Sequence, residues 1–279
     1  MSKTGKPLLS IVTVVYSDPD GLVRTVESAS GLPLDSAEMW IINGSSDERA
    51  RDRTRSIASP SIHKVIEPDD GIYDAMNKGA ARATGSYISM NAGDTFAPNF
   101  GEHFTTLASA MRRPDSSSSS ECVIIGYGIE SYAEDYYLRP NVGEESKSLC
   151  SPMHHATFYR REVFSKWNFD TTTPIGADGA LTHLVLQYFG GVFIPIVVCI
   201  FELGGASSSY ENMNVLRSRW AEKSARGKAK LVTKTISHRL FSRQSFYRIL
   251  ALRKGDRLAG PPPDVTAGIS NHLARSQVA

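Results

Sequence analysis

The first ninety residues alternate short apolar runs, rich in β-branched residues, with segments of helical periodicity. Buried strands are predicted at residues 8–16, 39–42, 62–66 and 86–90. Helices are predicted from Asp18 to Ser30, through about Ala58, and from Ile72 to Ala83. Strands that alternate with helices pair in parallel and form doubly wound sheets. The sequence therefore predicts an α/β fold.

Polar turns follow three of the predicted strands, at Tyr16–Asp20, Asn43–Asp47 and Asn91–Asp94. Ligands of such sheets bind outside the carboxyl ends of the strands, where these turns would meet. No GxGxxG follows the first strand and no GxxxxGK[ST] occurs, which argues against a dinucleotide-binding Rossmann enzyme and a P-loop NTPase. We therefore expect a ligand site at this edge of the sheet. These turns alone do not specify the class of ligand.

Two acidic residues allow both a structural and a chemical interpretation. Asp94 lies among Asn and Gly, which are ordinary turn formers, yet it also ends a strand and can bind a metal ion or phosphates. Asp178 opens the helix predicted over Ala177–Gly191, where it can cap the helix or act as a free carboxylate. Further strands are expected at Cys122–Ile129 and Val192–Phe201.

Composition indicates a water-soluble globular chain. Of its 279 residues, 41% are hydrophobic and 22% charged, and the net charge is +2. Three scattered cysteines fit no metal spacing and favour a reducing compartment. The first apolar run lacks a cleavage-site pattern, and the longest, Val192–Phe201, is about half of what a bilayer span needs. We therefore expect a cytoplasmic protein.

Residues 217–254 contain twelve lysines and arginines but one acidic residue, Glu222, with aromatic and aliphatic residues between them. This pattern suits solvated helices, an interaction surface or a helix that lies on anionic lipid. We favour peripheral association with the inner face of the cytoplasmic membrane, and we expect no nucleic acid partner. From residue 255 the sequence has no periodicity and predicts a disordered tail.

The segment EPDDGIYDAMNKGAARATGSYISMNAGD, residues 67–94, resembles bacterial family 2 glycosyltransferases of the GT-A fold, and among them the enzymes of exopolysaccharide and colanic acid clusters. The resemblance covers roughly residues 8–210. Its other pieces follow in the family's order: SIVTVVYS, WIINGSSDE, MHHATFYRR, GAD and ELGGAS.

The resemblance implies a Rossmann-like nucleotide-binding half with a mixed sheet. With the composition of the C-terminal part, we expect a glycosyltransferase domain at 1–210, a basic amphipathic helical region at 211–254 and a disordered tail at 255–279. The resemblance also implies an inverting glycosyltransferase that moves a hexosyl or deoxyhexosyl group from a UDP- or GDP-linked donor. The implied acceptor is a lipid-linked oligosaccharide or polysaccharide of exopolysaccharide biosynthesis.

The resemblance also implies a set of site residues. The first turns would hold the base and ribose of the donor. The implied donor-binding residues are Val14, Tyr16, Asn43, Ser45, Asp69, Gly71, Asn77, Asn91 and Gly93. Asn43 stands where the family usually has an Asp that accepts a hydrogen bond from the base, and Asn91 replaces the leading acid of the DXD-type element. The neutral residues predict a weaker base contact and a weakly held metal ion.

In the implied chemistry, Asp94 binds Mg²⁺ or Mn²⁺ at the diphosphate and Asp178 takes the proton of the attacking hydroxyl. His154 and Gly205 are implied to lie near the acceptor or diphosphate, with a core histidine and a plain turn as equal alternatives. The pair His154 and His155 has no second His/Cys cluster, which argues against zinc. Either Asp69 or Asp70 can cap the following helix while the other faces the donor, and Asn77 can also face it.

Two other functions compete with the glycosyltransferase interpretation. A catalytically inactive nucleotide-sugar-binding relic, acting as a subunit of a membrane assembly, would explain Asn43 and Asn91. A nucleotidyltransferase would need a basic phosphate-gripping loop near the first strand, whereas YSDPDG is acidic.

Overall fold

The computed structural model describes residues 6–33, 36–98, 100–112, 123–139, 152–204, 225–252 and 256–258. The chain divides into two compact units. The first comprises residues 1–128 and 146–200, and the second comprises residues 129–145 and 201–279.

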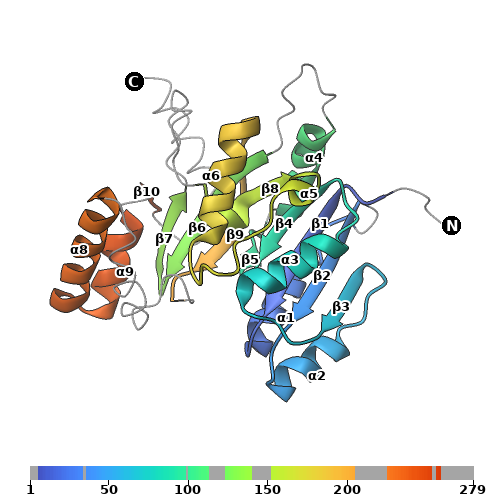
Figure 1. Cartoon of the computed structure of the whole chain (residues 1–279), viewed down its shortest axis with the longest axis horizontal. Coiled ribbons are helices and arrows are strands. Elements are labelled where there is room, and N and C mark those ends of the chain that lie inside the picture. The colour runs from blue at the N-terminus through green and yellow to red at the C-terminus, as the bar shows by residue number, and fades with distance from the viewer. Residues whose placement is uncertain are drawn as a thin grey trace. The chain divides into compact units, whose positions relative to one another are not determined.

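The first unit begins with parallel strands joined by helices (Figure 1). The strands are β1 (Leu9–Val15), β2 (Ala37–Asn43), β3 (Ile62–Ile66) and β4 (Tyr87–Asn91). The helices between them are α1 (Pro19–Ala29), α2 (Glu48–Ser56) and α3 (Ile72–Arg82). These strands lie in the order β4, β1, β2, β3, and every neighbouring pair is parallel. The predicted α/β alternation is confirmed.

Antiparallel strands make the remainder of this sheet mixed, as the implied GT-A fold requires. The elements are β5 (Thr95–Phe96), α4 (Phe100–Met111), β6 (Val123–Tyr132), the 3₁₀ helix η1 (His154–Ala156), β8 (Thr157–Arg160), α5 (Val163–Lys166), α6 (Ala177–Phe189) and β9 (Val192–Glu202). Strand β8 runs antiparallel between β4 and β6, and β5 pairs antiparallel with β9.

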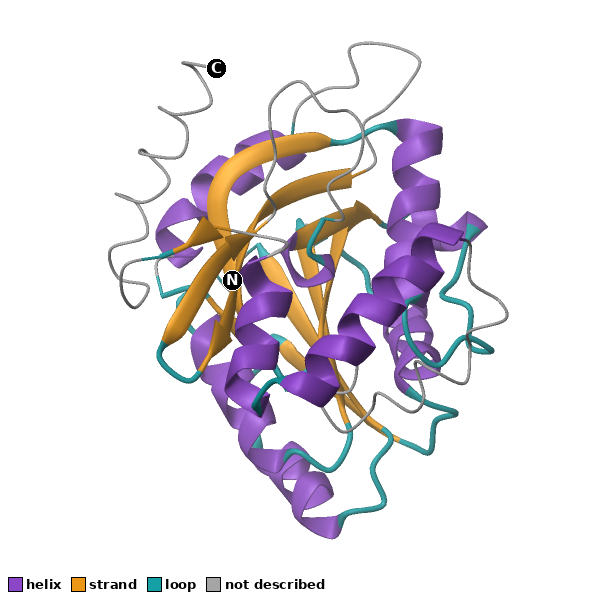
Figure 2. Cartoon of the chain, turned by 90° about the vertical axis from the view of Figure 1, so that its left-hand side faces the viewer, coloured by secondary structure: helices purple, strands orange, loops and turns teal. Residues whose placement is uncertain are grey.

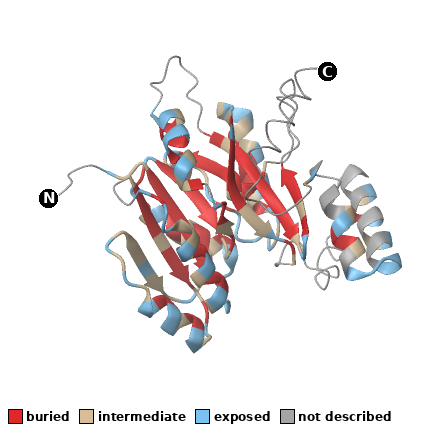
Figure 3. Cartoon of the chain, turned by 180° about the vertical axis from the view of Figure 1, so that it is seen from behind, coloured by how far each residue is buried: buried red, intermediate tan, exposed pale blue. Residues whose placement is uncertain are grey.

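Alternation along the strands supplies a core on each face of the sheet. Val12, Val14 and Ile42 pack in one cluster with residues of α3 and α6, and Figure 1 shows these two helices on the same face. Phe100 of α4 stacks on Phe96 and Phe158 in a separate aromatic group. Figure 2 shows helices on both sides of the strands, and Figure 3 shows most strand residues buried.

Local sequence explains where the helices begin. Asp18 caps α1 by accepting a hydrogen bond from the Gly21 N–H at 2.8 Å, and Asp47 caps α2 through the Arg49 N–H at 3.0 Å. Helix α3 follows Gly71, whose φ of 109° lies in the region that favours glycine.

The second unit has its own small core. Its described elements are the end of β6, β7 (Asp135–Arg139), α8 (Ala225–Leu240), α9 (Arg243–Leu252) and β10 (Asp256–Arg257). Its core consists of Tyr137, Leu203, Leu231, Phe246 and Tyr247.

Ion pairs join the C-terminal elements of the second unit to β7. The Asp135 carboxylate accepts hydrogen bonds from Arg248 at 2.5 Å and from Arg257 at 2.7 Å, and Glu130 pairs with Arg139. These contacts lie within the second unit, which groups residues 129–145 with residues 201–279.

The predicted basic helical region contains α8 and α9 over residues 225–252. Most of the predicted tail at 255–279 lies outside the described residues. Within the described part of the chain, no helix is both long enough and apolar enough to cross a membrane.

Candidate active site

The loops at the carboxyl ends of β1 and β2 are bonded to each other through Ser45. Its Oγ accepts the Ser17 N–H at 3.2 Å and the Asp47 N–H at 2.9 Å, and it lies 3.1 Å from the Ser17 Oγ. Ser45 is buried. Ser45, a predicted donor-binding residue, therefore holds the β1–α1 loop and the β2–α2 loop together by hydrogen bonds.

Two glycines show how closely the other strand-end loops approach. A Cβ on Gly44 would lie 1.5 Å from Asp69 Oδ2, so the carboxylate of the β3–α3 loop lies against the β2–α2 backbone. A Cβ on Gly93, whose φ is 91°, would lie 3.5 Å from Asp18 Oδ2. The loops after β1, β2, β3 and β4 thus meet at one edge, as the parallel order predicted.

Tyr16 and Val14 are both predicted to bind the donor, but their side chains differ sharply in solvent exposure. The Tyr16 side chain is 74% exposed directly after β1, which leaves its ring available to a ligand at this edge. The Val14 side chain is buried in the core under α3 and α6. The prediction for the Val14 side chain is therefore corrected, because its surface is used for packing.

The Asn43 side chain does not face a ligand. It is fully buried, and its Nδ2 donates to the Ala50 carbonyl and to Thr54 Oγ1 at 3.1 and 2.8 Å. Its Oδ1 accepts the Ser45 N–H at 2.9 Å. The predicted contact with the nucleotide base is wrong in this structure, because Asn43 binds the start of α2 to the end of β2.

Asn91 also turns inward. Its Nδ2 donates to the Asp94 carbonyl at 3.0 Å, and its Oδ1 accepts the Asp94 N–H at 2.9 Å. Thr25 donates to the same Asp94 carbonyl at 2.8 Å. The predicted role of Asn91 at the donor is therefore corrected: it closes the turn that presents the Asp94 carboxylate.

The Asp94 carboxylate lies beside a histidine. Only 8% of Asp94 is exposed, and its Oδ2 is 3.1 Å from Nε2 of His155. The close approach of the imidazole limits how the carboxylate can turn. Asp94 is thus a positioned carboxylate at a strand end.

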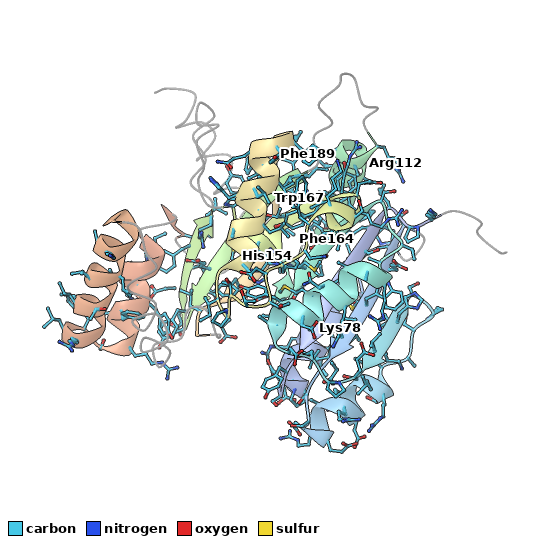
Figure 4. All side chains as sticks on the ribbon, viewed as in Figure 1. Lys78, Arg112, His154, Phe164, Trp167 and Phe189 are labelled. Atoms are coloured by element: carbon cyan, nitrogen blue, oxygen red, sulfur yellow. The ribbon has the colours of Figure 1, made fainter. Side chains whose placement is uncertain are left out.

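His154 is buried in the core, the alternative that the sequence left open for it, and it is also a neighbour of Asp178. Figure 4 shows it near the N-terminal end of α6. Its Nδ1 is 3.3 Å from the Tyr159 hydroxyl, and its ring packs edge-on against Phe169. Burial lowers the pKa of His154 from 6.5 to about 4, so the imidazole is neutral at pH 7.

Asp178 is not the cap of α6, since Gly176 occupies the N-cap position without a side-chain bond. Its Oδ1 accepts a hydrogen bond from the Tyr73 hydroxyl at 2.8 Å, and the same hydroxyl accepts the Gly176 N–H at 2.8 Å. Tyr73 therefore holds both the carboxylate and the turn before it.

Electrostatics keeps Asp178 ionised. Burial acts to raise its pKa, but the charge of His154 in its protonated form, the Tyr73 hydrogen bond and the Gly179 N–H lower it more. Burial and the charge of Asp178 raise the pKa of Tyr73 to about 12, so Tyr73 stays a hydrogen-bond donor. Geometry links the two aspartates: the His155 ring, which contacts Asp94, lies 5.5 Å from the His154 ring, and His154 is a neighbour of Asp178.

Helix α3 contributes structure more than ligand contacts. Asn77 exchanges two hydrogen bonds of 2.9 Å with the backbone of Phe169, so its predicted role at the donor is corrected. Lys78, labelled in Figure 4, donates to the Pro68 carbonyl at 2.7 Å and pairs with Asp74 at 2.9 Å.

The loop before α3 holds two predicted donor-binding residues. Asp69 accepts the Gly71 N–H at 3.0 Å, and Gly71 is exposed at the N-cap of α3. Neither Asp69 nor Asp70 is the N-cap residue. The predicted residue Gly205 lies outside the described residues.

The residues at Asp94 suit a hard divalent cation better than zinc. Within the described ranges, no three His, Cys, Asp or Glu side chains gather as a metal site. Mg²⁺ and Mn²⁺ accept one or two carboxylates together with water and substrate phosphates. The single buried carboxylate of Asp94 fits that requirement.

Two important residues were missed by sequence reasoning. His155 was considered only as half of a possible zinc pair, and the start of η1 decides which histidine turns toward Asp94. Tyr73 is separated from Asp178 by 105 residues, so no local pattern links them.

Known proteins resemble this chain in sequence. A family model described as "Glycosyl transferase family 2" matches residues 10–167. An uncharacterized glycosyltransferase of Mycobacterium tuberculosis is 26% identical over 216 residues, which cover 75% of this chain and 80% of that protein.

Two solved structures have a similar fold. The mannosyltransferase PcManGT from Pyrobaculum calidifontis, in complex with GDP-Man and Mn²⁺, has a TM-score of 0.55 at 15% identity, covering 99% of this chain and 87% of that chain. S. aureus TarS has a TM-score of 0.54 at 11% identity, covering 85% and 73%. TarS has also been crystallised with UDP-GlcNAc, with a TM-score of 0.51 at 10% identity, covering 86% of this chain and 75% of that chain. At these identities the similarity concerns the fold.

Proposed function

Because the chain belongs to glycosyl transferase family 2, we propose that it transfers a hexosyl or deoxyhexosyl group from a nucleotide-sugar donor to an acceptor hydroxyl with inversion. The observation that supports this most is the ionised Asp178 carboxylate, which Tyr73 orients and which shares a site with Asp94. One site thus offers a base for the acceptor and a carboxylate for the donor side.

The donor is proposed to be UDP- or GDP-linked. The loops after β1 to β4 meet at one edge of the sheet, where Tyr16 is exposed. The related folds of TarS and PcManGT have been crystallised with UDP-GlcNAc and GDP-Man, respectively. We assign the base and ribose to the edge beside Tyr16, Asp69 and Gly93.

Asp94, oriented by His155, would hold Mg²⁺ or Mn²⁺ together with the donor's own phosphates. When bound, this cation would stabilise the negative charge that develops on the diphosphate leaving group. The protein's contribution is a carboxylate that is already oriented and mostly shielded from water.

Asp178 is proposed to accept the proton of the acceptor hydroxyl as its oxygen attacks the anomeric carbon. The bond to the nucleotide diphosphate breaks in the same displacement, on the opposite face of the sugar. A single displacement inverts the anomeric configuration. The lowered pKa keeps Asp178 in the basic form near neutral pH.

The acceptor is proposed to be a lipid-linked oligosaccharide or polysaccharide of exopolysaccharide biosynthesis. The protein would reach it by peripheral association with the inner face of the cytoplasmic membrane. This proposal is supported by α8 and α9, whose sequences contain basic residues and no acidic ones.

Asp178→Asn tests the assignment of the base. We expect a fall in turnover of about 10²- to 10⁴-fold, because the amide cannot accept the proton. Affinity for UDP or GDP with Mn²⁺, measured by calorimetry, should persist. Asp52→Asn, at an exposed residue of α2, is the matched control and should keep full activity. Near wild-type turnover in Asp178→Asn would show that another group is the base.

The inactive relic is the second candidate, favoured by the neutral Asn43 and Asn91 where acids are usual. It predicts no transfer or hydrolysis in a screen of nucleotide sugars. Calorimetric titration of the wild-type chain with UDP and GDP, with and without Mn²⁺, measures whether the donor site binds a nucleotide and whether binding needs the metal ion. Metal-dependent binding with turnover excludes the relic, and absence of turnover supports it, whether or not a nucleotide still binds.

A further inference from the structure

Large apolar side chains are exposed at few places in the described part of the chain, and most of these places belong to α8 and the residue that follows it. Among the described residues, seven such side chains are exposed. Four of them are 43–72% exposed and form what we call the α8 stripe: Val232, Ile236, Leu240 and Phe241. Such clustering indicates an interaction surface.

The α8 stripe is not the face by which α8 packs in its own unit. Val232, Ile236 and Leu240 are four residues apart and share one face of the helix. Leu231 is buried instead, in the cluster that contains Phe246 of α9. Helix α8 therefore has one face packed inside its unit and a second apolar face toward solvent.

The charge of α8 indicates what covers this second face. The helix contains no acidic residue and five basic ones: Arg226, Lys228, Lys230, Lys234 and Arg239. Arg239 is exposed one residue before Leu240. In α9, by contrast, Arg248 is bound to Asp135. An apolar face on a helix with only positive charge is complementary to an anionic lipid surface.

We propose that the α8 stripe is the membrane-docking face of this protein, lying in the interface of an anionic bilayer with α8 parallel to its surface. The inference rests on the membrane association proposed above and not on the transfer reaction. A second copy of the chain is a poorer occupant, because it would bring two such basic helices together. Helix α8 has 16 residues, and no described helix is both long and apolar enough to cross a membrane.

Vesicle flotation tests the proposal with the full chain. Wild-type protein should float with vesicles of phosphatidylcholine and phosphatidylglycerol, and much less with phosphatidylcholine alone. Ile236→Ser/Leu240→Ser should lower the partition coefficient by roughly tenfold or more, because two apolar side chains leave the lipid interface. Tyr188→Ser, at a side chain 70% exposed in the first unit, is the matched control and should bind as wild type does.

Depth of insertion gives a second readout. Brominated acyl chains should quench the indole emission of a Leu240→Trp variant by more than they quench that of wild type. Equal flotation of the double-serine variant and wild type would overturn the proposal. Equal quenching of the Leu240→Trp variant and wild type would overturn it too, as would self-association through the stripe without vesicle binding.

Binding of UDP or GDP with Mn²⁺, measured on the same variants, separates this proposal from the proposed function. The double-serine variant should keep nucleotide affinity, since α8 lies in the other unit from Asp94 and Asp178. Loss of vesicle binding with nucleotide binding intact supports docking by the stripe. Vesicle binding without nucleotide affinity would instead leave docking intact and contradict the proposed function.

Discussion

The polar side chains at the ends of β2 and β4 form hydrogen bonds inside the protein rather than facing the site. Asn43 and Asn91 each bond to nearby backbone groups, because buried amides must be paired when no water reaches them. A carboxylate at either position could not donate the Nδ2 bonds seen here. The neutral residues thus match the local backbone and leave Asp94 as the carboxylate that reaches the site edge.

His154 makes stability depend on pH. In the unfolded chain the imidazole binds a proton below about pH 6.5, whereas in the folded protein it does so only below about pH 4. The unfolded state therefore binds more protons in this window, and stability is fully present above pH 6.5 and falls as pH drops toward 4. At about 1.4 kcal/mol per pKa unit, the loss is on the order of 3 kcal/mol.

Urea unfolding of His154→Gln between pH 4 and 7 checks this prediction. The variant should lose less stability than wild type as the pH falls, because Gln does not titrate. His63→Gln, at a half-exposed histidine of β3, should retain the wild-type pH dependence. Parallel curves for His154→Gln and wild type would contradict the buried neutral imidazole.

Tyr73 should set the pH at which Asp178 becomes protonated. Tyr73→Phe removes the hydrogen bond that helps lower the pKa of Asp178. That pKa should rise, so the acid limb of kcat/KM against pH should move to higher pH. Tyr188→Phe serves as a control, with an unchanged profile. An acid limb that stays in place would mean that a group other than Asp178 governs it.

At the scale of elements, α3 lies close against the sheet because of Gly79. A Cβ there would lie 2.2 Å from Val12 Cγ1 and 3.2 Å from Ile42 Cγ1, both of which belong to the buried core. The short distance places Tyr73, on the same helix, within reach of Asp178. Helix packing and site geometry are thus linked through one glycine.

Gly79→Ala should destabilise the protein by ~1–3 kcal/mol, because Val12 must move or α3 must shift outward. Gly179→Ala is the matched change in α6, where a Cβ meets nothing within 4 Å. It should stabilise by roughly 0.4–1 kcal/mol, since alanine loses less backbone entropy on folding. Thermal unfolding of both variants measures the difference, and equal effects would refute the packing argument.

At the scale of the whole molecule, the chain has two units with separate cores. In the second unit, the nearly buried Asp135 carboxylate holds Arg248 of α9 and Arg257 of β10. The hydrogen bond from Arg248 is the main influence that lowers the pKa of Asp135. One carboxylate therefore secures elements more than a hundred residues away in sequence.

Asp135→Asn should loosen the second unit and leave the first unchanged. We expect faster amide hydrogen exchange in β7, α9 and β10, because the charge that holds both arginines is lost. Exchange in β1 to β4 should match wild type. Glu134→Gln, at the exposed neighbouring residue, should change neither unit. Faster exchange throughout the chain would show that the two units unfold together.

The sequence by itself determined the alternation of strands and helices and the meeting of polar turns at one sheet edge. Each of these depends on hydrophobic period or turn chemistry within a few residues. The motifs around residues 67–94 also sufficed to indicate the family, which the comparison confirms.

Only the tertiary structure decided which polar groups face the site. Asn43, Asn77 and Asn91 turn inward, because partners supplied by folding satisfy them. His155 rather than His154 meets Asp94, and Tyr73 reaches Asp178 across 105 residues. These outcomes depend on long-range packing and on the free-energy cost of burying an unpaired polar group. Neither can be predicted from a local sequence pattern.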